Sequence, residues 1–218
     1  FFLNRASEMS LKVSQVRNQR IYIDKESSEV ESVYLNEEEI KKIYNLDLSH
    51  DFELDNARDN LVISCFSGLR VSDLMTGLKT DNIKEGFISV KTKKTKTFVT
   101  IPVHFYCESI LRKRFGQLPK KTTTFEYNRL IRIVCQLAEI DNQILAKVWN
   151  SDKKRKEIKY VKKCEAIGSH TARRSFASNL YGKVPNEVIQ SVAGWSSSEM
   201  LNHYNKTSKK EYAEQLKE

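Results

Sequence analysis

Two arginines, a histidine and a tyrosine stand in short polar stretches of this chain, and together they suit one chemistry. Arg70 ends a Ser-Gly-Leu-Arg stretch, His170 and Arg173 share a His-Thr-Ala-Arg stretch, and Tyr204 follows Trp195 by nine positions. Guanidinium groups match the geometry of phosphate oxygens and hold them through paired hydrogen bonds. A phenol whose proton a neighbouring base accepts can attack the phosphorus so held. The set therefore predicts a phosphoryl-transfer site.

The charge of the chain indicates a polyanionic partner. The chain has 218 residues, which is enough for one large domain or two small ones. Its formal net charge is +9. Nucleic acid and an anionic membrane surface both attract such a protein. No apolar run approaches the roughly 20 residues that span a bilayer. The first residues are apolar for only three positions, so we expect no signal peptide. Nucleic acid is the favoured partner.

The cysteines predict neither a zinc site nor disulfides. They are widely spaced, without a Cys-x-x-Cys pair, and two lie in apolar runs. We interpret all four as reduced thiols of a cytoplasmic protein: Cys65, Cys107, Cys135 and Cys164. No carboxylate cluster typical of magnesium nucleases and no glycine-rich phosphate loop is present, so we expect no metal and no cofactor.

Residue periodicity predicts a mainly α fold with one small antiparallel β-sheet, an α+β class. Strands are expected at 87–91 and 97–101, with Pro102 ending the second. A capping box of Asn36 and Glu39 begins the first helix of the compact part. Further helices follow at helical spacing: 54–66 ending at Gly68, a short one after Arg70, 104–116, 124–139, 170–181, 185–193 ending at Gly194, 197–204 and 208–217. Residues 151–163 form a strongly basic stretch without a helix or strand assignment.

Composition divides the chain near residue 33. Residues 1–32 mix charge and serine with weak periodicity, and we interpret them as a linker. The compact domain is expected to cover 33–218, with a tail helix from about residue 208 whose spacing of Tyr212, Ala213 and Leu216 is amphipathic. That helix could pack on a neighbouring protomer or on its own domain, and the sequence leaves both open.

Three stretches in order resemble the boxes of the tyrosine recombinase, or phage integrase, family. Residues 67–74 are similar to its first-arginine box, 170–177 to its His-x-x-Arg box, and 192–197 with Tyr204 to its last box. The resemblance covers about residues 33–210 and implies the catalytic-domain fold of that family. It also implies that 1–32 is a linker or a remnant of an upstream DNA-clamping domain.

The resemblance implies a role for each site residue. Tyr204 would attack the scissile phosphate and form a 3′-phosphotyrosyl link, while Arg70 and Arg173 hold the non-bridging oxygens and His170 acts as base. Family members often place the general-acid lysine eight residues before the proline that ends the second strand. That position is Lys94, with Lys93 and Lys96 as alternatives.

Several further residues depart from the family pattern or stand outside the boxes. Trp195 occupies a position where most members carry histidine, and its indole can donate a hydrogen bond but cannot shuttle protons. Asp73 is expected to be structural, His203 to face away from the site, and His50 and His104 to be surface or cap residues. We expect eight further basic residues of the two lysine-rich stretches and the second box to contact DNA phosphates: Lys91, Lys93, Lys96, Lys153, Lys154, Arg155, Lys156 and Arg174.

The sequence thus predicts a site-specific DNA recombinase, an integrase of a bacterial mobile element that needs neither metal nor ATP. Its expected partners are double-stranded DNA, further copies forming a tetramer on DNA and accessory DNA-bending proteins, with no membrane. The expected location is the cytoplasm, at the nucleoid. Two alternatives remain at this stage: a type IB topoisomerase, and a non-catalytic DNA-binding module in which Tyr204 is a packing residue.

Overall fold

The computed structural model describes residues 32–150 and 153–207. Their first helix, α2 (Glu37–Tyr44), begins as predicted. The Asn36 side chain accepts a hydrogen bond from the Glu39 amide at 2.9 Å, and the Glu39 carboxylate accepts one from the Asn36 amide at 2.8 Å. Both exchanges satisfy amides that a helix start leaves unpaired. The predicted linker and the predicted tail helix at 208–217 lie outside the described residues, apart from Ser32.

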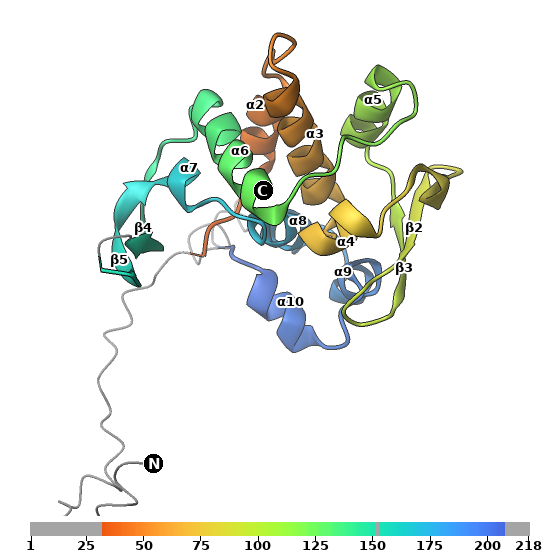
Figure 1. Cartoon of the computed structure of the whole chain (residues 1–218). Coiled ribbons are helices and arrows are strands. Elements are labelled where there is room, and N and C mark those ends of the chain that lie inside the picture. The colour runs from red at the N-terminus through yellow and green to blue at the C-terminus, as the bar shows by residue number, and fades with distance from the viewer. Residues whose placement is uncertain (1–31, 151–152, 208–218) are drawn as a thin grey trace, which may run out of the picture. The chain divides into compact units, whose positions relative to one another are not determined.

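Two central helices, α3 (Phe52–Ser67) and α8 (Thr171–Leu180), pack closely together. Ser64 and Ser67 of α3 and Ala177 of α8 are buried. The buried Ser175 hydroxyl accepts a hydrogen bond from the Leu35 amide at 2.8 Å, which fixes the entry segment of the domain to α8. Helices α5 (Phe105–Lys113) and α6 (Thr124–Leu137) also pack against α3 (Figure 1).

The predicted sheet is present, with one additional short strand. Strands β1 (Ile83–Lys84), β2 (Phe87–Lys91) and β3 (Phe98–Pro102) pair antiparallel in that order. Burial alternates along β2 and β3. The inward positions are all apolar, whereas the outward positions carry lysine, serine and threonine together with the exposed Phe87 and Phe98. Pro102 ends β3 as predicted, and the sheet lies beside the helical body at the right of Figure 1.

The prediction of a single sheet is wrong. Strands β4 (Gln143–Asn150) and β5 (Arg155–Lys162) form a separate two-stranded antiparallel ribbon, with eight residue pairs from Gln143↔Lys162 to Asn150↔Arg155. Five of the eight β5 residues are lysine, arginine or glutamate, which are not enriched in strands, so composition hid the extended conformation. Only the base of the ribbon is buried, next to α7 (Lys163–Ala166).

The C-terminal part forms a second, smaller hydrophobic cluster. Helices α9 (Asn186–Ala193) and α10 (Ser198–Tyr204) pack on α8, and the buried members of the cluster are Phe176, Ala177, Ile189, Ala193, Trp195, Leu201 and Tyr204. Among the described residues, no helix has the length and apolar character needed to cross a membrane.

All four cysteines are buried and unpaired, as predicted. Burial raises the pKa of the Cys65 and Cys107 thiols to about 12, so both remain protonated near neutral pH.

Candidate active site

A glycine turn between α3 and the short helix α4 (Val71–Thr76) places Arg70. Gly68 ends α3 in the left-handed conformation, with φ of 63°. A Cβ atom on Gly68 would lie 2.6 Å from Cδ1 of Phe176 on α8, so only glycine allows this approach. Arg70 stands two residues later, as the N-cap of α4. The first box is thus held directly against the second.

Arg173 links all three sequence boxes through its guanidinium. Its Nη1 donates to the Gly68 carbonyl at 2.6 Å, and its Nη2 donates to the Ala193 carbonyl at 3.0 Å. The residue is only 2% exposed. Its Nε is buried and has no hydrogen-bond partner. Arg173 is therefore both a structural clamp between distant segments and a source of an unused donor.

Tyr204 and Trp195 stack beside this guanidinium. Their rings are nearly parallel, 4° apart in plane and 5.1 Å between centroids. The guanidinium carbon of Arg173 lies 4.8 Å from the Trp195 ring and 5.2 Å from the Tyr204 ring. Gly194 precedes Trp195 in the left-handed conformation, and a Cβ there would lie 2.7 Å from Val99 of β3. The last box is thus packed against the sheet as well as against α8.

These residues border a cavity of about 220 Å³, and it receives residues from all three boxes and from the β2–β3 turn. Its lining residues are Arg70, Val71, Ser72, Lys94, Ser169, His170, Arg173 and Tyr204. Tyr204 is 7% exposed, yet it faces this opening and is not sealed in the core. Five of the six predicted catalytic residues therefore line one cavity. The sixth, Trp195, does not line it but stacks on Tyr204.

Unsatisfied polar atoms occur in this cavity and beside it: Arg70 and Arg173 line it, Asp73 lies next to Arg70, and Trp195 stacks on Tyr204. Among the described residues, buried side-chain atoms without a hydrogen-bond partner occur in six places, and four of them are Arg70 Nη1, Asp73 Oδ2, Arg173 Nε and Trp195 Nε1. A buried donor left without a partner costs about 1–3 kcal/mol, so such a cluster requires an explanation. Three of the four are donors, and the oxygens of a phosphate would satisfy them.

Asp73 connects the sheet to the first arginine. Its Oδ1 accepts a hydrogen bond from the Lys93 amide at 2.8 Å, and its Oδ2 lies 3.8 Å from Arg70 Nη1. The second distance allows charge attraction but is too long for a hydrogen bond. Asp73 therefore positions the turn that carries Lys94 and leaves the Arg70 donor available. This matches the structural part that the sequence predicted for it.

The clustered cations shift the pKa values of the site. Burial lowers the pKa of Arg173 to about 10, with a further lowering from the charge of Arg70 and an opposing effect from Tyr204. The pKa of His170 falls below its ordinary 6.5 because of burial and then the charges of Arg174, Arg173 and Arg70. His170 is therefore neutral at pH 7 and able to accept a proton.

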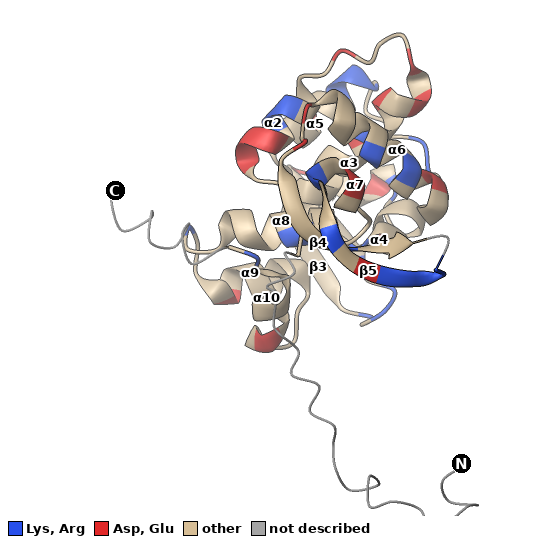
Figure 2. Cartoon of the chain, turned by 90° about the vertical axis from the view of Figure 1, so that its left-hand side faces the viewer, with Lys and Arg blue, Asp and Glu red and all other residues tan. Residues whose placement is uncertain are grey.

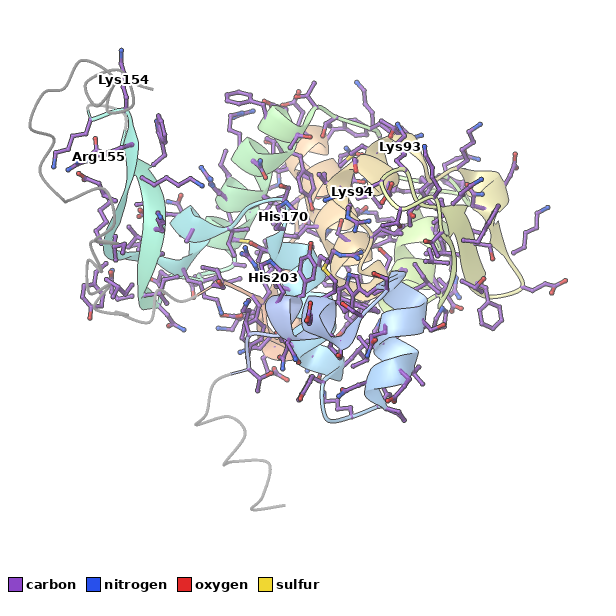
Figure 3. The ribbon with its side chains drawn as sticks, turned by 90° about the horizontal axis from the view of Figure 1, so that it is seen from below. Lys93, Lys94, Lys154, Arg155, His170 and His203 are labelled. Carbon is purple, nitrogen blue, oxygen red and sulfur yellow. The ribbon has the colours of Figure 1, made fainter. Side chains whose placement is uncertain are left out.

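The other lysines of the turn lie outside the cavity. Lys91 places its ammonium 5.5 Å from the Phe98 ring, Lys93 contributes its backbone amide to Asp73, and Lys96 takes the left-handed turn conformation with φ of 57°. Figure 3 shows Lys94 and His170 on the central part of the molecule. Two serines of the lining, Ser72 and Ser169, were not predicted from the sequence, although each lies next to a box residue or within a box.

The remaining histidines differ in their relation to the site. His104 caps α5 by accepting from the Tyr106 amide, and His50 is exposed, both as predicted. His203 is exposed and does not line the cavity, but its ring meets Tyr204 edge-on at 5.2 Å and its charge helps to lower the pKa of His170. The 100° offset between adjacent helical residues turned it away from the cavity without separating it from the phenol ring.

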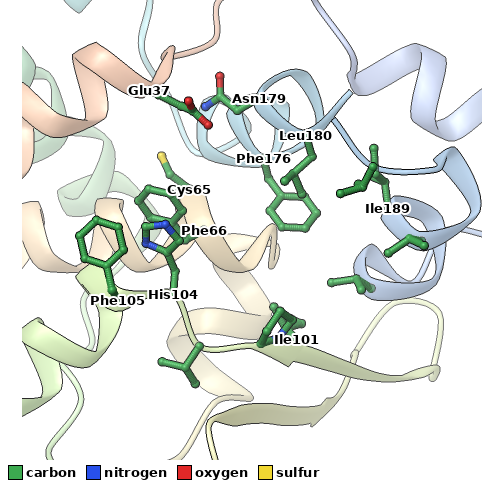
Figure 4. Close-up of a pocket in the computed structure, with 15 residues that line it drawn as sticks. Glu37, Cys65, Phe66, Ile101, His104, Phe105, Phe176, Asn179, Leu180 and Ile189 are labelled. Carbon is green, nitrogen blue, oxygen red and sulfur yellow. The ribbon is translucent and has the colours of Figure 1, made fainter. Parts of the chain in front are cut away.

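A larger cavity, of about 470 Å³, lies elsewhere and contains none of the predicted catalytic residues. It is mainly apolar and is enclosed by α3, β3, α5, α8 and α9 (Figure 4). His104 stacks on Phe66 in its wall, with ring centroids 3.7 Å apart. No group of three or more His, Cys, Asp or Glu that could hold a metal ion occurs within residues 32–150 and 153–207.

Comparison with known proteins agrees with this geometry. Residues 33–211 match the model of the phage integrase family, a range that contains all three boxes and the cavity. The chain belongs to the phage integrase family. No curated protein sequence is significantly similar to this family member.

Solved structures show that this integrase-family chain has the fold of known recombinases. The crystal structure of XerA recombinase superposes with a TM-score of 0.59 at 19% identity, covering 85% of this chain and 64% of XerA. A lambda integrase (75–356) dimer bound to a COC′ core site superposes with a TM-score of 0.57 at 17% identity. This match covers 93% of this chain and 68% of the lambda integrase chain. XerH recombinase bound to difH in a pre-cleavage complex superposes with a TM-score of 0.56 at 19% identity. This match covers 86% of this chain and 54% of XerH. The chain thus spans about two thirds of XerA and about half of XerH.

Proposed function

We propose that this chain is the catalytic part of a site-specific DNA recombinase that breaks and rejoins DNA strands. The observation that carries the proposal is the cavity in which Tyr204 meets Arg70 and Arg173, each of which has a buried donor without a partner. Trp195, which has a third such donor, stacks on Tyr204. Membership of the phage integrase family and the fold of recombinases captured on DNA support the same conclusion.

The proposed cleavage step is an attack by the Tyr204 oxygen on the scissile phosphorus. The new O–P bond leaves a 3′-phosphotyrosyl link, and the broken P–O bond releases a 5′-hydroxyl. Arg70, Arg173 and the Trp195 indole would hold the non-bridging oxygens, where charge increases in the transition state. The phosphotyrosyl link retains the bond energy for rejoining, so the reaction as proposed uses neither ATP nor a metal ion.

Two residues would move the protons of this reaction. Neutral His170 would accept the proton of the Tyr204 hydroxyl. Lys94 would donate a proton to the leaving 5′-oxygen, because it is the one turn lysine that borders the cavity within the described part of the chain. Rejoining would reverse both transfers.

The wider DNA contacts and assembly extend the same proposal. The basic residues around the site would contact phosphates: Lys91, Lys93, Lys96, Lys153, Lys154, Arg155, Lys156 and Arg174. Residues 33–218 would form the catalytic domain, and residues 1–32 would be a linker or a remnant of a DNA-clamping domain. A lambda integrase tetramer bound to a Holliday junction has the same fold, at a TM-score of 0.58 and 18% identity, and supports a tetramer as the working form. Accessory DNA-bending proteins would assist this assembly. The protein would act in the cytoplasm, at the bacterial nucleoid.

Covalent trapping tests the proposal. The protein is incubated with a suicide duplex that carries the junction between the gene's own element and the neighbouring chromosome, and SDS-resistant adducts are counted. We expect an adduct with the natural chain, none with Tyr204→Phe, and an unchanged yield with the control Tyr106→Phe, which lies on α5 and does not line the cavity.

Three other outcomes would contradict the proposal. Binding without any adduct would favour the non-catalytic DNA-binding module. Relaxation of supercoiled DNA without exchange between paired sites would favour the type IB topoisomerase. An adduct that persists in Tyr204→Phe would assign the nucleophile elsewhere.

A further inference from the structure

The β4–β5 ribbon leaves apolar side chains in solvent that folding alone does not explain. Trp149 is 60% exposed, Tyr160 72% and Ile158 49%. The register places Trp149 opposite Lys156, and Lys147 opposite Ile158. Opposed residues of an antiparallel pair share a face, so one face of the ribbon alternates aromatic or aliphatic groups with lysines.

The opposite face already has a structural role. Ala146 and Val161 on that face are buried, and Ile144 packs against the main core. At the far end of the same face, the Glu157 carboxylate accepts from the Asn150 amide at 2.8 Å and pairs with Lys153 at 2.9 Å. The outer face, with Trp149 and Tyr160, is therefore the one left to meet a partner.

The charge of the ribbon specifies the kind of partner. Residues 143–162 contain seven lysines and arginines and only two acidic residues, Asp152 and Glu157, a difference of five within a chain whose net charge is +9. Glu157 is occupied by Lys153 and Arg155. No ion pair among the described residues engages the other ribbon lysines, which are Lys147, Lys154, Lys156, Lys159 and Lys162. Such a surface fits a polyanion.

The shape of the ribbon specifies how a polyanion would be held. The major groove of B-DNA admits a two-stranded β-ribbon. Eight residues per strand at about 3.3 Å each extend roughly 26 Å, the length of about eight base pairs. Figure 3 shows the end with Lys154 and Arg155 standing away from the body, and Figure 2 shows lysine and arginine along β5.

We propose that the β4–β5 ribbon inserts its outer face into the major groove of the DNA beside the cleavage site. Lys147, Lys156 and Lys162 would contact phosphates, while Trp149 and Tyr160 would contact base edges and thymine methyl groups. The inference rests on the proposed function for the identity of the DNA as substrate. It assigns the ribbon a reading role that is separate from the chemistry at Tyr204.

Salt-dependent binding tests the phosphate contacts. A mixed-sequence duplex serves as probe, in a Tyr204→Phe background so that cleavage plays no part. Replacing Lys147, Lys156 and Lys162 by Gln should reduce the log–log salt slope by about 2.7, at about 0.9 per phosphate. Between 50 and 200 mM salt, the affinity of the parent should then fall roughly 40-fold more than that of the variant.

A matched control removes the same charge elsewhere. Lys41, Lys42 and Arg112 are exposed on α2 and α5. Replacing them by Gln should change the log–log salt slope by less than about 0.9, the contribution of one phosphate. If the ribbon triple variant does not fold, as judged by its melting curve, the single Lys156→Gln variant tests the same contact with an expected slope change of about 0.9.

A second duplex tests for the major groove. Every cytosine of the probe is replaced by glucosylated 5-hydroxymethylcytosine, whose sugar fills that groove. The parent should bind this duplex about fivefold or more weakly than the plain one, and a Trp149→Ala, Tyr160→Ala variant should bind the two duplexes alike.

Unchanged salt slope and unchanged groove discrimination in the ribbon variants would overturn the inference. Loss of self-association with intact DNA binding would also overturn it, because the ribbon would then be a protein–protein surface. If adduct formation at Tyr204 is normal while the ribbon variants bind like the parent, the inference fails and the proposed function stands. If ribbon-dependent binding occurs without any adduct, the proposed function fails instead.

Discussion

The two antiparallel hairpins of this protein carry similar lysine-rich turns but are held very differently. The β2–β3 hairpin buries alternate side chains, contacts α9 at Gly194, and ties its turn to Asp73 through the Lys93 amide. The β4–β5 ribbon is buried only near its base and exposes Trp149, Ile158 and Tyr160. A lysine can serve one chemical step only if its backbone is fixed, whereas a lysine that contacts phosphate along a duplex can remain mobile. Under the proposed function, the comparison assigns catalysis to the fixed hairpin and DNA contact to the exposed ribbon.

The largest expected difference between the two regions concerns arginine. Arg70→Ala should lower the cleavage rate about 10²–10³-fold, because a charge that stabilises the transition state is lost. Arg70→Ala should also destabilise the fold, because it removes the charge that lies 3.8 Å from the buried Asp73 carboxylate. The rate is therefore measured on protein that a melting curve shows to be folded. Arg155→Ala on the ribbon should leave the single-turnover rate unchanged at saturating protein. Normal cleavage by Arg70→Ala would remove Arg70 from the mechanism.

A lysine exchange sharpens the contrast. Lys94→Gln should slow cleavage by about 10²-fold or more, because the leaving oxygen loses its proton donor, and Lys154→Gln at the ribbon tip should not. A substrate with sulfur in place of the leaving 5′-oxygen needs no proton and should restore the Lys94→Gln rate. Failure of that rescue would indicate that Lys94 binds phosphate and does not donate a proton.

The contact between α3 and α8 that holds the catalytic region can be disrupted by a substitution at Gly68. Gly68→Ala would combine φ of 63° with a 2.6 Å contact to Phe176, and we expect it to lower the free energy of unfolding by about 2–5 kcal/mol. Gly116→Ala has φ of 81° and open space around it, so only the backbone cost of about 1–2 kcal/mol should remain. Denaturant unfolding measures both. Equal losses would show that the contact between α3 and α8 yields easily.

The smallest expected effect is that of pH. Burial and the neighbouring arginines lower the pKa of His170 below 6.5, so the neutral base persists on acidification to that value. The single-turnover cleavage rate should therefore stay level from pH 8 to 6.5, then fall up to about tenfold per unit below the depressed pKa as the base becomes protonated. His170→Gln should lack that fall. DNA binding by the ribbon should not follow this titration, because the ribbon contains no histidine. If DNA affinity and cleavage rate fell together with pH, the proposed division between the ribbon and the catalytic site would be contradicted.

The sequence predicted much of the fold because many of its elements follow local rules. The Asn36 capping box, the glycine ends of α3 and α9, and the alternation of β2 and β3 all depend on residues a few positions apart. The β4–β5 ribbon was missed for a physical reason. Its outer face is not buried, so its pattern of charge and aromatic residues follows the needs of a partner and not those of the core.

The sequence by itself determined which residues could carry the chemistry, because a tyrosine, two arginines and a histidine are recognisable by type and local spacing. Only the tertiary structure decided that Lys94, and not Lys93 or Lys96, borders the cavity, and that Trp195 lies against Tyr204. Those relations depend on contacts such as the one from Arg173 to the Gly68 carbonyl, across 105 positions of the chain. Local periodicity contains no information on such distances, whereas the packing of α3, α8 and the sheet fixes them.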